Sequence, residues 1–419
     1  MYREWGYFFD HKMLTIEGKI VYSDITSRGR IEIGDSGLIT SVTQETGTAD
    51  VVLQDEFIFP GFIDLHVHAR ESMDHIQEYK ENFTTAGFAA INGGVVAFAD
   101  MPNNIVPPVD EESYQAKQEL TKKSAVEVVL YAGIGPVTNP LQRKVPYKVF
   151  MGKSVGDLFF ESFEDLEKVL AKYSGQFVSF HCEDPKILNE NTTQVLHQSK
   201  RPEIAEVSAV DFALQMIEKY KIVGKICHCS TMEGLQKIID AKKRGVQVSV
   251  EVTPHHLYFD PPSTSLHDKL LQVNPPIRQG RASRLDLIQA LKNGSIDYLA
   301  TDHAPHTLEE KEKGISGMPH LDTYGNFVTW LIKDCNFTPA EVLRVCSYNP
   351  AKFINEFSLF KYGEIKVGNA GSLTVIDLNT PTEVRRDKLK TKSKWSPFEG
   401  MKFPGRVKSV IIKGKVYEN

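Results

Sequence analysis

The sequence predicts an α/β fold: a (β/α)8 TIM barrel over residues 59–361, with a small β-sandwich domain built from both ends of the chain, residues 1–58 and 362–419. Two observations predict it. From about residue 60, eight apolar runs rich in β-branched residues alternate with segments of helical pattern, which is the order of elements in a closed parallel barrel. The two ends of the chain instead alternate and turn often, as antiparallel strands do.

The eight predicted barrel strands are short and apolar. In chain order they cover residues 62–68, 94–101, 125–133, 147–152, 177–183, 221–229, 246–254 and 296–304. Helices are expected where apolar groups recur three and four residues apart, at 78–92, 162–173, 203–220 and 231–244. The second of these helices opens with Ser-x-x-Asp, which is close to a capping box.

The ends of the chain have a different texture from the barrel. Residues 13–56 read as a meander of β-strands, and residues 363–377 and 405–418 have the same alternating pattern. A separate sheet at each end would leave unpaired edge strands. We therefore expect the two ends to meet in one small β domain beside the barrel.

Composition narrows the function classes. The 419 residues carry a net charge of −5, which gives no electrostatic footprint for nucleic acid or an anionic membrane surface. No run of about eighteen apolar residues is present to span a bilayer. Five cysteines are an odd and low number for a secreted disulfide scaffold. We expect reduced thiols in a cytoplasmic protein that acts on a small molecule.

Six chemically active residues fall at or just after the predicted strand ends, where the active sites of such barrels lie. They are His66, His68, Lys148, His181, His228 and Asp302. Taken singly, each has an ordinary reading as a bonded core histidine, a lysine that reaches solvent, or a helix-capping aspartate. Together they converge on one barrel mouth, and a divalent metal site satisfies them jointly. The set is too large for one ion and suits two that share a bridging ligand.

Lys148 is the member of this set that does not fit as an ammonium. A cation beside a dication is repelled by roughly 4 kcal/mol at about 4 Å, even at an effective dielectric constant of about 20. Lys148 must therefore lose its charge, or change its sign, to belong to the site.

These motifs resemble the amidohydrolase superfamily: HVH at 66–68, the lysine of YKVFMG, HCED at 181–184, HCS at 228–230 and TDHAPH at 301–306. The resemblance implies that CO₂ carboxylates Lys148 to a carbamate that bridges two zinc ions together with a hydroxide. It further implies His66, His68 and Asp302 on the first zinc, and His181 and His228 on the second. The cation thereby becomes an anion, which answers the charge problem.

Within the superfamily the whole chain resembles the dihydroorotases, through Arg70 after HVH, DMPNN at 100–104, VNPPIR at 273–278 and the full DHAPH. The resemblance implies reversible hydrolysis of (S)-dihydroorotate to N-carbamoyl-L-aspartate in pyrimidine (UMP) biosynthesis, with Asp302 as general acid and base. Arg70, Asn103 and His306 would bind the substrate carboxylate, and Asn274 the ring. The glycine-containing loop at 314–325 departs from the usual pattern. A homodimer is common in this family.

Two other readings compete with this one. A related cyclic amidase, allantoinase or hydantoinase, would usually lack Asn274 and His306, or the Arg70 and Asn103 carboxylate clamp. A catalytically dead scaffold would lose metal ligands that are all present here. We do not assign metal to His255, His256 or His320, nor to Cys182 and Cys229, which are expected to be buried structural thiols.

Overall fold

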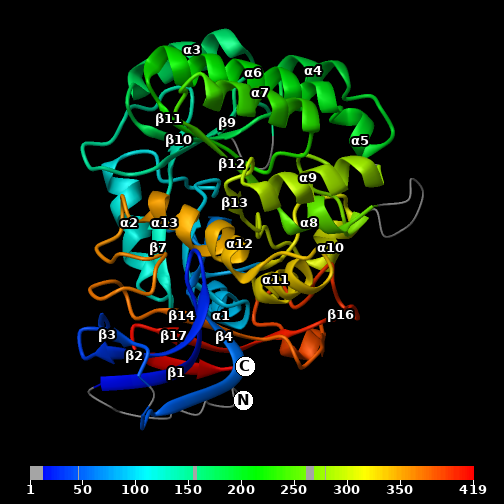
Figure 1. Ribbon diagram of the computed structural model, residues 1–419. Coiled ribbons are helices and arrows are strands. Elements are labelled where there is room, and N and C mark those ends of the chain that lie inside the picture. Colours follow the sequence, from blue (N-terminus) through cyan, green and yellow to red (C-terminus); the bar gives the residue numbers. More distant parts are fainter. Residues whose placement is uncertain (1–12, 46, 154–157, 261–268, 279) are drawn as a thin grey trace.

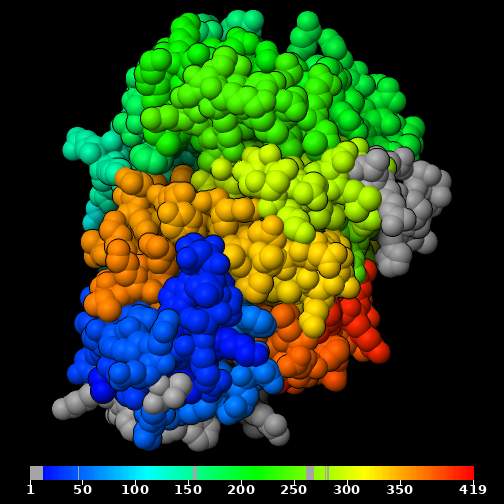
Figure 2. Space-filling model, viewed as in Figure 1, coloured from blue at the N-terminus to red at the C-terminus, as the bar shows by residue number. Residues whose placement is uncertain are grey.

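The computed structural model describes residues 13–45, 47–153, 158–260, 269–278 and 280–419 (Figure 1). A parallel barrel occupies the middle of the chain, and the sheet of the two ends lies on one side of it. In Figure 2 the residues from 13 onward, in blue, and the last part of the chain, in red-orange, occupy the same end of the molecule. The fold class predicted from the sequence is confirmed. The domain limits at 58/59 and 361/362 stay a prediction.

The barrel strands pair in parallel throughout the two sheets that form the wall. They are β5 (Phe62–Val67), β6 (Val95–Asp100), β7 (Glu127–Leu130), β8 (Ala132–Ile134), β9 (Tyr147–Phe150), β10 (Phe177–His181), β11 (Val223–Ile226), β12 (Val248–Val252) and β13 (Tyr298–Leu299). β7 pairs with β6 and β8 with β9, so these two consecutive pieces form the third strand. Closure comes after β13, where the His68 amide donates to the His303 carbonyl at 2.8 Å.

Helices follow the barrel strands and cover the outside of the wall (Figure 1). They are α1 (Phe83–Asn92), α2 (Glu111–Thr121), α3 (Phe163–Leu170), α4 (Pro185–Glu190), α5 (His197–Lys200), α6 (Glu203–Tyr220), α7 (Met232–Lys243), α8 (Pro254–Tyr258), α9 (Arg281–Asn293), α10 (Leu308–Glu312), α11 (Tyr324–Lys333), α12 (Pro339–Leu343) and α13 (Asn349–Ile354). α6 has the predicted bounds. α1 begins later than predicted, because Asn82 is its N-cap and accepts from the Thr85 amide.

The β domain is one seven-stranded ladder in the order β18-β17-β14-β4-β1-β2-β3. Its strands are β1 (Met13–Val21), β2 (Thr26–Gly34), β3 (Ile39–Thr43), β4 (Val51–Pro60), β14 (Leu373–Asp377), β17 (Arg406–Ile412) and β18 (Lys415–Glu418). β14 from the carboxyl-terminal part inserts between β17 and β4. The strands enclose their own core, which includes Ile16, Ile31, Ile58 and Val375. The two ends of the chain therefore form one sheet, as the edge-strand argument expects.

One segment between β14 and β17 leaves the sheet and reaches the barrel mouth. It includes the short strands β15 (Thr382–Glu383) and β16 (Lys402–Phe403). Trp395 of this segment is buried and donates from Nε1 to the His306 carbonyl at 2.7 Å. Thr391 donates to the buried Glu81 carboxylate. Residues near the end of the chain thus hold the loop that follows β13. Within the described ranges, no helix combines the length and the apolar character that crossing a bilayer requires.

Candidate metal centre and active site

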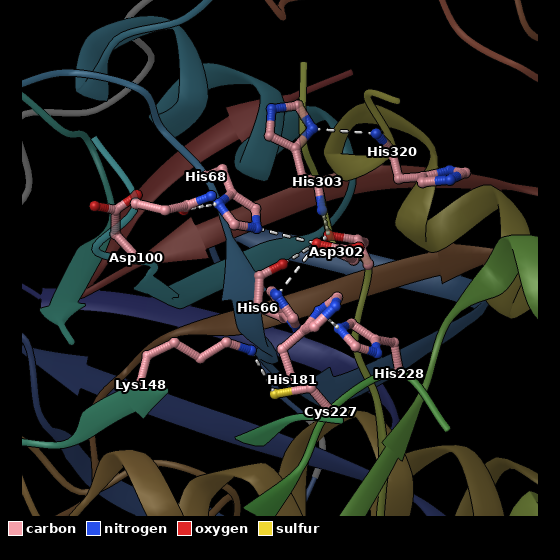
Figure 3. A network of polar contacts seen from close by, with 12 residues as sticks. His66, His68, Asp100, Lys148, His181, Cys227, His228, Asp302, His303 and His320 are labelled. Atoms are coloured by element: carbon pink, nitrogen blue, oxygen red, sulfur yellow. Dashed lines mark hydrogen bonds and ion pairs between the residues drawn. The ribbon is translucent and has the colours of Figure 1, made fainter. Parts of the chain in front are cut away.

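The structure brings the six predicted residues together at the carboxyl-terminal ends of the barrel strands (Figure 3). All six are buried, Lys148 completely. His66 lies on β5, Lys148 on β9 and His181 at the end of β10. The other three follow within one to three residues of a strand end: His68 after β5, His228 after β11 and Asp302 after β13. Parallel strands end at the same edge of the barrel, which is why residues more than 200 positions apart meet here.

The ligand atoms form two groups. In the first, Nε2 of His66 and Nε2 of His68 each lie 3.1 Å from Oδ1 of Asp302. In the second, Nδ1 of His181 lies 2.9 Å from Nε2 of His228. His66, His228 and Asp302 offer ligand atoms within 4.8 Å of one another, so the groups adjoin. The sequence resemblance assigns the two groups to separate ions, and that assignment stays a prediction.

Acceptors behind three of the four histidines fix the direction in which those rings present their lone pairs. Asn103 Oδ1 lies 2.6 Å from Nδ1 of His68, and Glu183 Oε2 lies 2.7 Å from Nε2 of His181. Glu251 contacts Nδ1 of His66 in the same way. An acceptor at the outer nitrogen holds the proton there and leaves the inner nitrogen to coordinate. The rings are thus oriented as metal ligands.

The electrostatics of the site also fit a metal centre. Burial lowers the pKa of His66, His68 and His228 well below the usual histidine range, and the nearby Lys148 charge acts in the same direction. Burial raises the pKa of Asp302 to about 7, against the opposing effect of Lys148. Neutral imidazoles are the form that binds a metal. The donor set of nitrogen and carboxylate oxygen suits zinc and its neighbours in the transition series.

Lys148 has a partner that sequence reasoning missed. Its Nζ donates to Cys227 Sγ at 2.9 Å and lies 5.2 Å from the centre of the Phe150 ring. Burial raises the pKa of the Cys227 thiol, so the sulfur is neutral and does not balance an ammonium. A carbamate on Lys148 would remove that imbalance.

A buried ion pair behind His66 also escaped the sequence analysis. Lys225 and Glu251 are almost fully buried and form a salt bridge. Glu251 also accepts from the His228 amide at 3.3 Å. Two signals pointed to the pair: each residue is a charge inside an apolar strand run, KIVGKICHC and VQVSVEVTP. Their mutual contact was invisible in the sequence because it depends on the pairing of β11 with β12.

Three of the four predicted substrate residues line the same cavity as the predicted metal ligands. The cavity is lined by His66, His68, His181, His228 and Asp302, and also by Arg70, Asn103, Asn274, Ser316 and Gly317. His306 lies beside Arg70, with its Nε2 3.3 Å from Nη2 of the guanidinium. Two atoms of the Arg70 guanidinium, Nε and Nη1, are buried and have no hydrogen-bond partner among the described residues, and the same holds for Oδ1 of Asn274. These atoms could form hydrogen bonds with a polar ligand.

Three of the site residues adopt left-handed backbone conformations. The φ angles are 61° at Arg70, 36° at His228 and 49° at Asp302. Non-glycine residues rarely adopt such angles, and the cost is of order 1–3 kcal/mol each. Each residue follows a barrel strand, so the bend turns its side chain into the mouth. Strain at three convergent positions marks this end of the barrel as functional.

The residues that we set aside lie near the site without joining it. His255 and His320 stack, with Nδ1 and Nε2 3.0 Å apart, although no partner for His320 is predicted from the sequence. His256 contacts the Pro275 carbonyl at 3.2 Å. Cys182 and Cys229 are buried and donate to backbone carbonyls, as expected of structural thiols. All five cysteines are free.

Comparison with known proteins agrees with the site. The model of the amidohydrolase family matches residues 159–417. The dihydroorotase of Thermococcus kodakarensis is 34% identical over 415 residues, which cover 96% of this chain and 94% of that protein. The dihydroorotase of Pyrococcus furiosus is 33% identical over 410 residues, with coverage of 96% and 92%. The L-hydantoinase structure from Arthrobacter aurescens superposes with a TM-score of 0.86 at 22% identity, covering 96% and 95% of the two chains.

The chain belongs to the amidohydrolase family. The resemblance read from the sequence is thereby confirmed. Its relatives among the dihydroorotases match over nearly the whole length, whereas the hydantoinase structures, below 25% identity, establish the fold alone.

Proposed function

We propose that the protein is a dihydroorotase that hydrolyses the ring amide of (S)-dihydroorotate reversibly to N-carbamoyl-L-aspartate. The observation that carries the proposal is the buried Arg70 guanidinium with two unpartnered nitrogen atoms at the cavity. Burial lowers its pKa only to about 10, so it is a cation at neutral pH. Asp302, Asp100 and Glu310 stabilise this charge at longer range, but no carboxylate among the described residues forms an ion pair with it, and such a buried cation is costly. A substrate carboxylate would satisfy it through two parallel hydrogen bonds.

The remaining substrate contacts follow from the groups around Arg70. The pKa of His306 is lowered by burial to about 3, so its ring is neutral. With its proton on Nε2, the ring would donate to the carboxylate in place of the contact with Arg70 Nη2. The Asn103 amide, placed against His68, completes this side. Oδ1 of Asn274 accepts a ring N–H on the other side. These contacts orient the substrate amide toward the metal ligands.

The residues present fit a pair of divalent ions, which we propose to be zinc. His66, His68 and Asp302 would hold one ion, His181 and His228 the other, and carboxylated Lys148 would bridge them. When bound, the two ions would supply an activated water and polarise the amide carbonyl. The carbamate is testable without turnover: protein equilibrated with ¹³C-labelled bicarbonate should give one carbamate carbon resonance that is missing in Lys148→Ala.

Asp302 is the proposed general acid and base. Its carboxylate lies at the junction of His66 and His68, and burial raises its pKa to about 7. A carboxylate at this position can accept a proton from a water held between the two ligand groups and release it again. It would take the proton of the attacking water and deliver it to the leaving ring nitrogen. In the reverse reaction the direction of transfer inverts.

Selectivity separates this function from that of the hydantoinases and allantoinases. Hydantoin and dihydrouracil carry no carboxylate, so they would leave the Arg70 guanidinium buried and unpaired. A site built to bond a polar group discriminates strongly against analogues that lack it. We expect kcat/KM of the zinc-loaded enzyme to be at least about 10³-fold higher for dihydroorotate than for hydantoin, dihydrouracil or allantoin. Faster turnover of any of these three would contradict the proposal, and absence of both metal and turnover would favour a scaffold.

The proposal places the protein in pyrimidine biosynthesis, in the cytoplasm, as a homodimer with a small-molecule substrate. Five free thiols suit a reducing compartment, and the net charge of −5 gives no support for nucleic-acid or anionic-membrane binding.

A further inference from the structure

Lys311 is a buried lysine whose hydrogen bonds all go to backbone carbonyls. It lies on α10 and is completely buried. Its Nζ donates to the carbonyls of Gln272 at 2.8 Å, Ile315 at 2.9 Å and Gly317 at 2.8 Å. An ammonium has three N–H donors, so these three acceptors use its full capacity. Burial lowers the pKa of Lys311 to about 7, and only the protonated form donates all three hydrogen bonds.

The three carbonyls belong to two separate loops that form one wall of the active-site cavity. Gln272 lies two residues before Asn274, which lines the cavity, and Gly317 lines it directly. The loops also touch each other, since the Gly317 amide donates to the Gln272 carbonyl at 2.9 Å. Lys311 therefore lies behind the wall and joins both of its parts.

The cavity wall is too tightly packed at Gly317 to admit a side chain. This residue has a φ of +127°, and a Cβ atom there would lie 2.6 Å from the Ala304 carbonyl oxygen and 3.0 Å from the His306 ring. The loop backbone is thus pressed against the segment that carries Asp302 and His306. A shift of either loop would move Asn274 or the backbone at 317 relative to the substrate.

A neutral residue would serve a merely structural role at lower cost. Burying a cation without a carboxylate partner is expensive, and carbonyl dipoles offset only part of the penalty. The ammonium has one structural advantage over a neutral side chain. Its three N–H groups hold three carbonyls of two loops at fixed positions around one nitrogen atom. The capping box of Thr307 and Glu310 anchors the helix that carries it.

We propose that Lys311 is a positioning residue for substrate specificity, which sets the separation of the loops that carry Asn274 and Gly317 to fit the substrate ring. The inference rests on the proposed dihydroorotase function. Lys311 touches neither the metal ligands nor the Arg70 side of the cavity in any hydrogen bond of the described residues. Its direct contacts are with the ring side of the cavity.

The test is steady-state kinetics of zinc-loaded Lys311→Met, with the exposed Lys313→Met as the matched control. We expect KM for dihydroorotate to rise about tenfold or more in Lys311→Met, since several backbone hydrogen bonds are lost, while kcat changes less than about threefold and zinc content stays the same. Lys313→Met should behave as wild type. Lys311→Gln, which keeps two donors on a shorter side chain, should give a smaller rise and serves if the methionine variant fails to fold.

Double-mutant cycles separate positioning from general loosening. The effect of Lys311→Met on KM should largely vanish in an Asn274→Ala background, because both changes act on the ring side, and should add to that of Arg70→Met. Unchanged KM in both Lys311 variants, or equal additivity in the two backgrounds, would overturn the inference. If wild type itself does not turn over dihydroorotate, the proposed function fails; an active wild type with unaffected Lys311 variants refutes only the inference.

Discussion

Replacing Arg70 with methionine removes the buried charge at the cavity but keeps much of the side-chain volume. In the wild type this guanidinium donates from Nη2 to His306 at 3.3 Å, while Nε and Nη1 have no partner in the described part of the chain. The substitution therefore deletes the groups proposed to bind the substrate carboxylate. It deletes no metal ligand.

The magnitude follows from the two unpartnered nitrogen atoms. A hydrogen bond that involves a charged group contributes about 1.5–3 kcal/mol. Loss of two such bonds costs about 3–6 kcal/mol of transition-state binding, which lowers kcat/KM for dihydroorotate by about 10²- to 10⁴-fold. The free energy of unfolding should fall by about 1 kcal/mol at most. The variant loses one hydrogen bond to His306, which destabilises it, but it also loses a buried cation that has no direct ion pair, which offsets part of that cost.

The assay compares kcat/KM for dihydroorotate and for dihydrouracil, which lacks the carboxylate, in zinc-loaded Arg70→Met and wild type. Dihydroorotate should lose its advantage, and the slow turnover of dihydrouracil should not fall further. Arg143→Met is the matched control, because Arg143 forms a partly exposed pair with Glu111 and such pairs contribute little. Wild-type kcat/KM for dihydroorotate in a variant with its full zinc content would refute the assignment.

Three further predictions concern the surroundings of the site. Glu251→Leu and Lys225→Met should each lower the free energy of unfolding of the metal-free protein by about 3–5 kcal/mol, because each leaves a buried charge unpaired. In urea unfolding, the double variant should lose far less stability than the sum of the two single losses. Simple additivity of the two losses would count against a coupled pair. Burial lowers the pKa of His256 and His306 to about 3, so below the unfolded pKa of about 6.5 only the unfolded chain takes up these protons. Stability of the metal-free protein should hold above that pH and fall by about 2 kcal/mol per histidine at pH 5, and equal urea midpoints at pH 7 and pH 5 would contradict this. Trp395→Phe removes the bond to the His306 carbonyl and should raise KM for dihydroorotate severalfold through about 1 kcal/mol of lost positioning; unchanged KM would show that the loop is held by other contacts.

The sequence was sufficient for the barrel and for the six converging side chains. The barrel strands are buried on both faces, so their sequences are nearly continuous apolar runs. Polar residues at the ends of these runs, such as His181, are therefore easy to recognise. His66 and His68 share a face because strand residues alternate. None of this requires knowledge of which strands are neighbours.

The groups behind the ligands required the tertiary structure. Glu251 lies 185 residues from His66, and only the strand order around the barrel brings them together. Lys311 gave no signal at all, because in TLEEKEK a lysine reads as part of a solvated helix face. It is buried by two loops that the local pattern does not place. The N-terminal limit of α1 was likewise decided by the Asn82 cap, and not by the apolar period.

The contact between Trp395 and the His306 loop has a consequence for a chain that is still being made. Every predicted metal ligand and substrate residue has been added to the chain by residue 306, but the strand that pairs with β4 begins only at Leu373, and the indole that braces the loop belongs to Trp395. A chain that stops short of Trp395 thus carries all of these residues but lacks the indole that braces their loop.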